Sequence, residues 1–194
     1  MNSDRLRLDG IKTLVVDSDP AGSTLLLEML RGMGFTTLRL AETAKAAEAA
    51  LEQDGYDLCL CDAALPDASG AAFVRFVRAR PAPLRFLPIL AMTGYAAFDQ
   101  VLALRDAGAH LVMKKPASPQ GLYDRIAWVA QPRRGFVESE SYVGPDRRFR
   151  SLGPPGGVGR RTTDLSTELG AATEPNLSQD EIDSLIKPMK VMAE

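Results

Sequence analysis

The sequence contains only two cysteines and one histidine among 194 residues. Cys59 and Cys61 are separated by one residue in an apolar run, a spacing too short for a normal disulfide. A single histidine, His110, with no cysteine cluster nearby argues against a zinc site and disfavours a Ser-His-Asp catalytic triad. Carboxylates, hydroxyls and lysines therefore remain as the candidate chemistry.

The chain also lacks long apolar runs and an excess of one charge. No run approaches the roughly 20 apolar residues of a membrane-spanning helix. The polar N-terminus, MNSDRLRLDG, differs from a secretory signal peptide. The net charge of −2 gives no general attraction to nucleic acid or membranes. We therefore expect a cytoplasmic protein, and 45% hydrophobic residues suffice for one core plus an appendage.

Short apolar runs alternate with helix-like segments over the first two thirds of the chain. We expect strands near 11–16, 35–40, 58–62, 88–92 and 110–113. Helices are expected near 20–33, 43–53, 69–80, 97–107 and 118–130. The fourth helix should bury Phe98, Val101 and Leu102. This alternation predicts an α/β fold with a doubly wound, five-stranded parallel sheet.

Polar side chains follow four of the predicted strands: Asp17 and Asp19, Asp62, Thr93, and Lys115. In open α/β folds the carboxyl ends of the strands line one crevice, where ligands bind. Carboxylates in such a crevice favour a hard cation such as Mg²⁺, and the lysine neutralises the remaining charge. A phosphoryl group is the substrate that would use all of these groups, with a carboxylate attacking phosphorus.

Residues 10–130 resemble response-regulator receiver domains of the CheY type, through the motifs VVDSDP, DAALPDASG, AMTGYA and KKPAS. The resemblance implies Asp62 as the phosphoacceptor, Thr93 as the switch hydroxyl and Lys115 as the lysine that pairs with phosphate. It also implies Mg²⁺ held by Asp17, Asp62 and the backbone carbonyl of Ala64. A histidine kinase would supply the phosphoryl group. The protein would then be a phosphoacceptor with at most slow self-dephosphorylation, not an enzyme.

Two positions depart from the family pattern. Ser18 stands where the family usually has the second of two adjacent acids, the direct metal ligand. Asp19, one residue later, either reaches the metal or only caps its helix before Pro20, and the cap is favoured. Val112 stands three residues before the lysine, where the family usually has an aromatic switch residue. His110 is expected to be an exposed residue at a strand edge.

Two rival functions follow from these observations. A pseudo-receiver with a defective metal site would act as a constitutive interaction module. A haloacid-dehalogenase-type phosphatase would use Asp17 as nucleophile and Asp19 as acid/base, since VVDSDPA fits its Asp-x-Asp motif. That family needs further acids after the lysine, whereas only Asp124 follows within 20 residues. It also leaves Asp62 unexplained, so the receiver is the preferred prediction.

The composition changes after about residue 131. We predict a receiver domain at 10–131, a flexible linker rich in Gly, Pro and Arg at 132–176, a short amphipathic helix at 177–188 and a disordered end at 189–194. Binding of nucleic acid or a cyclic dinucleotide is a weak alternative for five arginines of the linker. These are Arg147, Arg148, Arg150, Arg160 and Arg161.

The predicted tail helix has strong local signals. Ser178 and Glu181 form a capping box, and Leu177 with Ile182 forms a hydrophobic staple across it. Ile182, Leu185 and Ile186 make one apolar stripe. A helix this short is marginal alone in water, so the stripe is expected to dock on a surface.

The segment LSQDEIDSLI, residues 177–186, resembles the N-terminal CheY-binding peptide of the flagellar switch protein FliM. This resemblance implies chemotaxis or motility signalling, with a flagellar motor or chemotaxis protein as partner. We expect the helix to dock in cis on the receiver's face between its fourth and fifth helices, more tightly when Asp62 is phosphorylated. Capture of another receiver in trans is the alternative. Trp128 is predicted as an exposed anchor for a partner, with packing under the following chain as its alternative.

Overall fold

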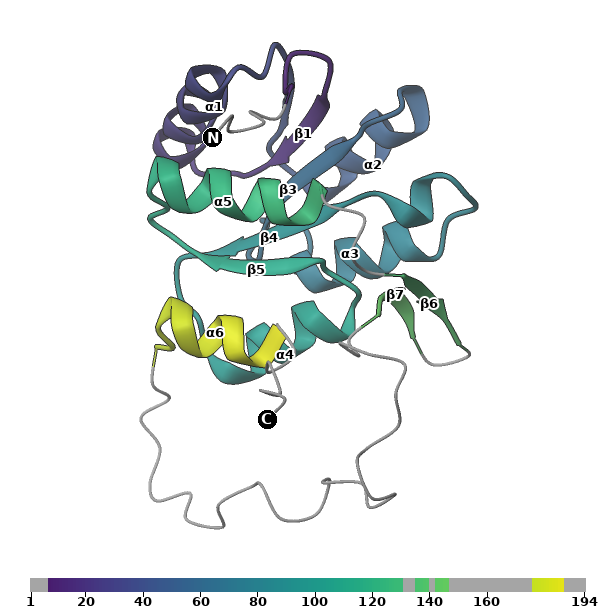
Figure 1. Ribbon diagram of the computed structural model, residues 1–194. Coiled ribbons are helices and arrows are strands. Elements are labelled where there is room, and N and C mark those ends of the chain that lie inside the picture. Colours follow the sequence, from purple (N-terminus) through teal and green to yellow (C-terminus); the bar gives the residue numbers. More distant parts are fainter. Residues whose placement is uncertain (1–6, 131–134, 140–141, 147–175, 187–194) are drawn as a thin grey trace, which may run out of the picture.

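The computed structural model describes residues 7–130, 135–139, 142–146 and 176–186. Its central sheet consists of β1 (Lys12–Val16), β2 (Thr37–Ala41), β3 (Leu58–Asp62), β4 (Ile89–Thr93) and β5 (Leu111–Lys114). The helices between and after them are α1 (Pro20–Met33), α2 (Ala44–Gln53), α3 (Gly70–Arg78), α4 (Phe98–Asp106) and α5 (Pro119–Ala130). All strands of this sheet are parallel, in the order β2-β1-β3-β4-β5 (Figure 1). The predicted doubly wound α/β fold is confirmed.

The strands at the centre of the sheet carry the core. Residues 58–61 of β3 and all of β4 are buried, as are the last four residues of β1. A parallel sheet is covered by helices on both faces, which explains why these strands are continuously apolar rather than alternating. Cys59 and Cys61 are free thiols within this layer. Burial raises the pKa of Cys59 to about 12 and raises that of Cys61 as well, so both are unreactive core residues.

The loop between β3 and α3 requires a glycine for steric reasons. A Cβ added at Gly70 would overlap the carbonyl oxygen of Asp62 and lie 2.8 Å from Cα of Ala63. The Gly70 N–H donates to the Ala63 carbonyl at 2.8 Å. This close approach brings the start of α3 directly behind the end of β3, and it fixes the backbone that carries Asp62.

Several of the expected side-chain environments are wrong. In α4, Val101 is buried as predicted, but Phe98 is 43% exposed and Leu102 is only half-buried. Leu104 is buried in their place, because α4 begins at Phe98 and its inner face runs through the next turn. Trp128 is half-buried and packs against the core, so it is not the exposed aromatic that was predicted. The buried residues of α5 are Leu122 and Ile126.

A small antiparallel hairpin lies inside the range that was predicted as a flexible linker. It pairs β6 (Phe136–Glu138) with β7 (Val143–Pro145). Phe136 packs edge-on against Phe86, with ring centroids 4.9 Å apart, and Glu138 pairs with Arg85 at 3.0 Å. The linker prediction therefore fails for these residues, because their partners lie about 50 residues earlier and leave no local signal. The predicted linker arginines and the end at 189–194 lie outside the described residues.

The hairpin covers a buried arginine at the amino end of the sheet. Arg78 is 2% exposed and donates to the carbonyls of Gly108 at 3.0 Å and Arg85 at 2.8 Å. Burial lowers the pKa of Arg78 to about 10. Its guanidinium also lies 3.3 Å from Nδ1 of His110, which is half-buried rather than exposed as predicted, and 5.3 Å from the Phe136 ring centroid.

The tail helix α6 (Gln179–Ile186) packs on α4 and β5 of its own chain (Figure 1). Its capping box is formed: the Ser178 N–H donates to Glu181 at 2.7 Å, and the Glu181 N–H donates to Ser178 Oγ at 3.3 Å. Ile182 is fully buried, Leu177 and Ile186 are nearly so, and Leu185 is half-buried. This is the face on which docking in cis was expected.

None of the helices in the described ranges is both long enough and apolar enough to cross a membrane.

Candidate functional site

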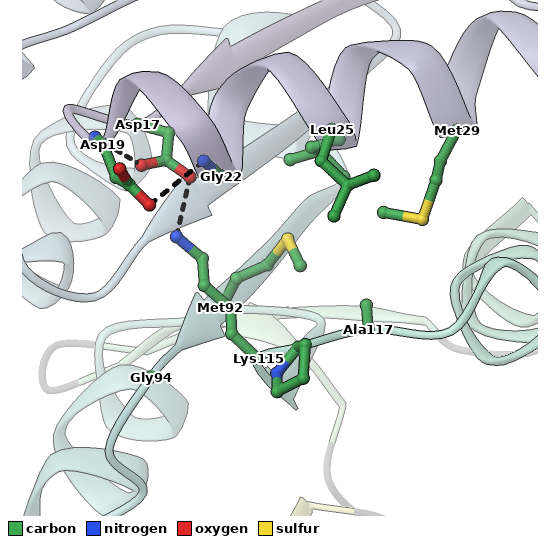
Figure 2. Close-up of a pocket in the computed structure, with 11 residues that line it drawn as sticks. Asp17, Asp19, Gly22, Leu25, Met29, Met92, Gly94, Lys115 and Ala117 are labelled. Carbon is green, nitrogen blue, oxygen red and sulfur yellow. Dashed lines mark hydrogen bonds and ion pairs between the residues drawn. The ribbon is translucent and has the colours of Figure 1, made fainter.

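The polar residues predicted to meet at the carboxyl edge of the sheet do lie together there. Lys115 follows β5, and its Nζ lies 2.6 Å from Oδ2 of Asp17, which follows β1 (Figure 2). The same Nζ lies 2.5 Å from Oδ2 of Asp62, the last residue of β3. The ammonium group therefore bridges two carboxylates that come from neighbouring strands.

This cluster is largely removed from solvent. The side chains of Asp17, Asp62 and Lys115 are 2%, 14% and 19% exposed. Burial by itself lowers the pKa of Lys115, but the hydrogen bonds that Lys115 donates to Asp17 and Asp62, together with the charges of these carboxylates, outweigh it, so the pKa is raised. Lys115 is consequently charged at neutral pH, and it offsets one of the two carboxylates.

The backbone holds the outer oxygen of each carboxylate. Oδ1 of Asp17 accepts a hydrogen bond from the Asp19 N–H at 3.0 Å. Oδ1 of Asp62 accepts one from the Ala64 N–H, also at 3.0 Å. In each carboxylate, one oxygen accepts a hydrogen bond from the Lys115 ammonium and the other accepts one from a backbone N–H just after the strand. These bonds fix the orientation of both carboxylates before any ligand binds.

Asp19 caps helix α1. Its Oδ1 accepts from the Ala21 N–H at 3.2 Å, and its Oδ2 accepts from the Gly22 N–H at 3.0 Å. Its side chain therefore lies against the first turn of the helix (Figure 2). Ser18 is exposed. The cap that was favoured for Asp19 is present.

The donor set fits Mg²⁺ with a small number of protein ligands. Mg²⁺ in proteins often takes one or two carboxylates and keeps several waters. Asp17 and Asp62 provide two convergent carboxylates, and the exposed Ala64 adjoins Asp62 in the loop that follows β3. Over the part of the chain that the structure describes, no group of three His, Cys, Asp or Glu side chains is arranged around a metal position. Water would therefore have to complete the coordination.

The hydroxyl of Thr93 faces the β4–α4 loop. Thr93 is 2% exposed, and its Oγ1 lies 2.7 Å from both the Tyr95 carbonyl oxygen and Oε1 of Gln100. The Tyr95 N–H donates to the same Oγ1 at 3.2 Å. Gln100 was not expected from the sequence, since it lies one turn into α4 and matches no motif. Val112 is buried in β5 and provides no aromatic side chain.

A cavity of about 340 Å³ adjoins the charged cluster. Figure 2 shows Asp17, Asp19 and Lys115 at one end, with Leu25, Met29 and Ala117 along the rest. Its apolar wall comes from α1 and from the loop after β5. This wall was not predicted, because its residues are contributed by segments about 90 residues apart in the sequence.

Comparison with known proteins gives the same picture. Residues 13–127 match the response regulator receiver domain model. The chain is 32% identical over 144 residues to the response regulator protein PilR of Pseudomonas aeruginosa, covering 74% of this chain and 31% of PilR. It is 30% identical over 116 residues to the chemotaxis protein CheY of the same organism, covering 60% of this chain and 93% of CheY.

Solved structures of receiver domains superpose well. The receiver domain of a sensor histidine kinase from Pseudomonas aeruginosa, which has a magnesium ion coordinated in its active-site cleft, is 29% identical with a TM-score of 0.57, over 63% of this chain and 99% of that one. A CheY-like receiver domain protein from Methanospirillum hungatei is 28% identical with a TM-score of 0.55, over 61% and 91%. The fold, the edge-of-sheet cluster and the match over residues 13–127 together establish that this chain belongs to the response regulator receiver domain family, whose members act in two-component signalling.

Proposed function

We propose that this protein is a response regulator that accepts a phosphoryl group on Asp62 from the phosphohistidine of a histidine kinase. The observation that carries the proposal is the Lys115 ammonium, held between Asp17 and Asp62 at 2.6 and 2.5 Å. An Asp62 oxygen would attack phosphorus, the P–N bond to the kinase histidine would break, and an acyl phosphate would remain on Asp62. Bound Mg²⁺ would neutralise negative charge between the phosphoryl oxygens and the carboxylates.

The chain's own residues would hold the product in three ways. Lys115 would move from Oδ2 of Asp62 to a phosphoryl oxygen while it keeps its contact with Asp17. The Ala64 N–H would keep the second Asp62 oxygen in place through its 3.0 Å hydrogen bond. Thr93 would turn its hydroxyl from the β4–α4 loop to another phosphoryl oxygen, which converts a local chemical change into a movement of the loop.

The output is proposed to be protein–protein interaction in chemotaxis or motility, within the cytoplasm. The similarity to CheY, which covers 93% of the length of CheY, supports a stand-alone signalling role. The FliM-like segment at residues 177–186 supports a flagellar motor or chemotaxis protein as the partner. PilR, a second relative, is matched over only 31% of its length. Recognition of nucleic acid or a cyclic dinucleotide through the linker arginines remains a weaker proposal.

The test is phosphorylation by acetyl phosphate in millimolar Mg²⁺, followed by intact-protein mass spectrometry. We expect the mass of one phosphoryl group to be added to the wild-type chain and to be lost completely in Asp62→Asn. Asp57→Asn is the matched control, since Asp57 is an exposed aspartate at the opposite end of β3. Labelling that persists in Asp62→Asn would refute the assignment of the phosphoacceptor.

The pseudo-receiver is a second candidate because Asp19 is engaged as a cap and Ser18 carries no charge. In that case neither acetyl phosphate nor beryllofluoride would produce any change in the wild-type chain at millimolar Mg²⁺. The domain would then act as a constitutive interaction module through the same surface.

Substitution Ser18→Asp should tighten Mg²⁺ binding by on the order of tenfold, because a carboxylate is a far better ligand for a hard cation than a hydroxyl. Isothermal titration with MgCl₂ measures the change. Ser18→Asn is the control that keeps the size and omits the charge. Unchanged or weaker binding in Ser18→Asp would mean that Asp19 already serves the metal.

A further inference from the structure

The segment that leads into α6 is hydrogen-bonded to the loop between β4 and α4. The Ala96 N–H donates to Oδ1 of Asn176 at 3.0 Å, and the Leu177 N–H donates to the Ala96 carbonyl at 2.9 Å. Ala96 is fully buried, and Leu177 is only 7% exposed. One bond is to the Asn176 side chain and the other joins two backbone groups, and they link positions 80 and 81 residues apart in the sequence, so they exist only while the tail is docked.

A second attachment lies one residue from the site lysine. Gln179 accepts from the Lys114 N–H at 2.7 Å and donates to the Val112 carbonyl at 3.2 Å. These backbone groups belong to β5, the edge strand of the sheet. The Gln179 amide pairs with the N–H and the carbonyl on the open side of β5, as the backbone of a further strand would. The same amide group donates to Asp183 at 2.9 Å, and Asp183 pairs with Arg125 of α5 at 3.0 Å. The tail therefore contacts β4–α4, β5 and α5 together.

The β4–α4 loop is held from its inner side by Thr93. Its hydroxyl contacts the carbonyl and the N–H of Tyr95, at 2.7 and 3.2 Å, and the Gln100 side chain at 2.7 Å. Tyr95 directly precedes Ala96, which the tail holds from the outer side. Two adjacent residues of one short loop are thus fixed by the switch hydroxyl and by the tail.

From this geometry we propose that residues 176–186 are an autoinhibitory latch that holds the β4–α4 loop in the unphosphorylated position and is released by phosphorylation of Asp62. This rests on the proposed function. When the Thr93 hydroxyl turns to a phosphoryl oxygen, it gives up Tyr95 and Gln100. The loop then changes position, and Ala96 loses the alignment of its two bonds to Asn176 and Leu177.

This proposed effect of phosphorylation on docking is opposite to the expectation from the FliM-like segment, which was tighter docking of the tail helix when Asp62 is phosphorylated. The reason is that the docked tail coexists here with a Thr93 hydroxyl already committed to the loop. Coupling between two sites is reciprocal, so a tail that is released by phosphorylation must oppose phosphorylation to the same degree. Couplings of this kind are typically about 5-fold to 150-fold.

The experiment uses the full-length chain and two readouts. Hydrogen exchange of the α6 backbone amides is measured with and without beryllofluoride and Mg²⁺, and binding of beryllofluoride is followed separately by fluorine NMR. The same fluorine signal is titrated to give the affinity for beryllofluoride of wild type, Asn176→Ala and Gln179→Ala. Ser184→Ala is the matched control, since Ser184 is exposed on α6 and bonds only within the helix, to the Glu181 carbonyl.

We expect beryllofluoride to speed exchange of the α6 amides by about fivefold or more, and both latch variants to bind beryllofluoride about fivefold or more tightly than wild type and Ser184→Ala. If Asp62 is labelled by acetyl phosphate but α6 exchange is unchanged or slower, and the latch variants bind beryllofluoride with the wild-type affinity, the latch is refuted while the proposed function stands. If no form of the chain is labelled or binds beryllofluoride, the proposed function fails, and the latch fails with it.

Discussion

Substitution Lys115→Met is expected to lower the free energy of unfolding by about 2 kcal/mol at neutral pH. The substitution leaves Asp17, which is 2% exposed, without the ammonium 2.6 Å from its carboxylate. Removal of one partner of a fully buried ion pair costs about 3 to 5 kcal/mol. The expected loss is smaller here, because Asp62 and Lys115 are 14% and 19% exposed and water can replace part of the interaction.

The pH dependence of this loss follows from the raised pKa of Lys115. A base whose pKa is higher in the folded state stabilises that state fully below its unfolded pKa, here near 10.5, and the stabilisation is lost as the pH rises through the folded value. The difference in stability between wild type and Lys115→Met should therefore be constant from about pH 7 to pH 9 and should shrink only above about pH 10.5.

Urea unfolding followed by circular dichroism measures these differences. Lys114→Met is the matched control: it removes the same charge from the adjacent residue, whose backbone N–H to Gln179 is retained. Millimolar Mg²⁺ should recover part of the loss in Lys115→Met, because a cation held by Asp17 and Asp62 replaces the missing ammonium. A Lys115→Met protein as stable as wild type without Mg²⁺ would show that the bridge contributes nothing net to folding.

Substitution Arg78→Met is expected to be more destabilising, by about 3 kcal/mol. The methionine fills much of the volume but leaves the carbonyls of Gly108 and Arg85 without their donors in a buried region. It also removes the guanidinium 5.3 Å from the Phe136 ring, which is part of what holds the β6–β7 hairpin against the receiver. Hydrogen exchange of the hairpin amides should accelerate more than the global loss of stability explains.

The control for Arg78 is Arg75→Met, which changes the same side chain at an exposed position of the same helix. Arg78→Lys adds a further comparison, since it keeps a charge but lacks the planar fork that reaches several acceptors at once. Arg78 lies at the amino end of the sheet, away from Asp62, so the rate of labelling by acetyl phosphate should stay within about twofold of wild type under conditions where the variant is folded. Equal stability of the Arg78→Met and Arg75→Met proteins would contradict the structural role of Arg78.

The sequence by itself determined the alternation of strands and helices and the position of the candidate site. The apolar runs of β1, β3 and β4 are local signals, as are the caps at Asp19, Thr43 and Ser69. Once the strands are known to be parallel, their carboxyl ends must share an edge, so residues that follow them are neighbours whatever the details of packing. The capping box of α6 was readable for the same reason, since its partners are three residues apart.

Only the tertiary structure decided how those neighbours are used. Lys115 and Asp17 are 98 residues apart, and the bridge between them depends on the packing of the whole sheet. The Thr93 hydroxyl contacts the Tyr95 carbonyl and the Gln100 side chain, and the second contact depends on where α4 is placed. The hairpin forms against Arg78 and Phe86, which have no local signal in the sequence. The face on which α6 docks was expected, but its hydrogen bonds to Ala96 and β5 join segments far apart in the sequence and were not. Local sequence patterns determine where helices and strands begin and end. Which side chains are buried, and which hydrogen bonds form between distant segments, depends on where packing brings those segments together.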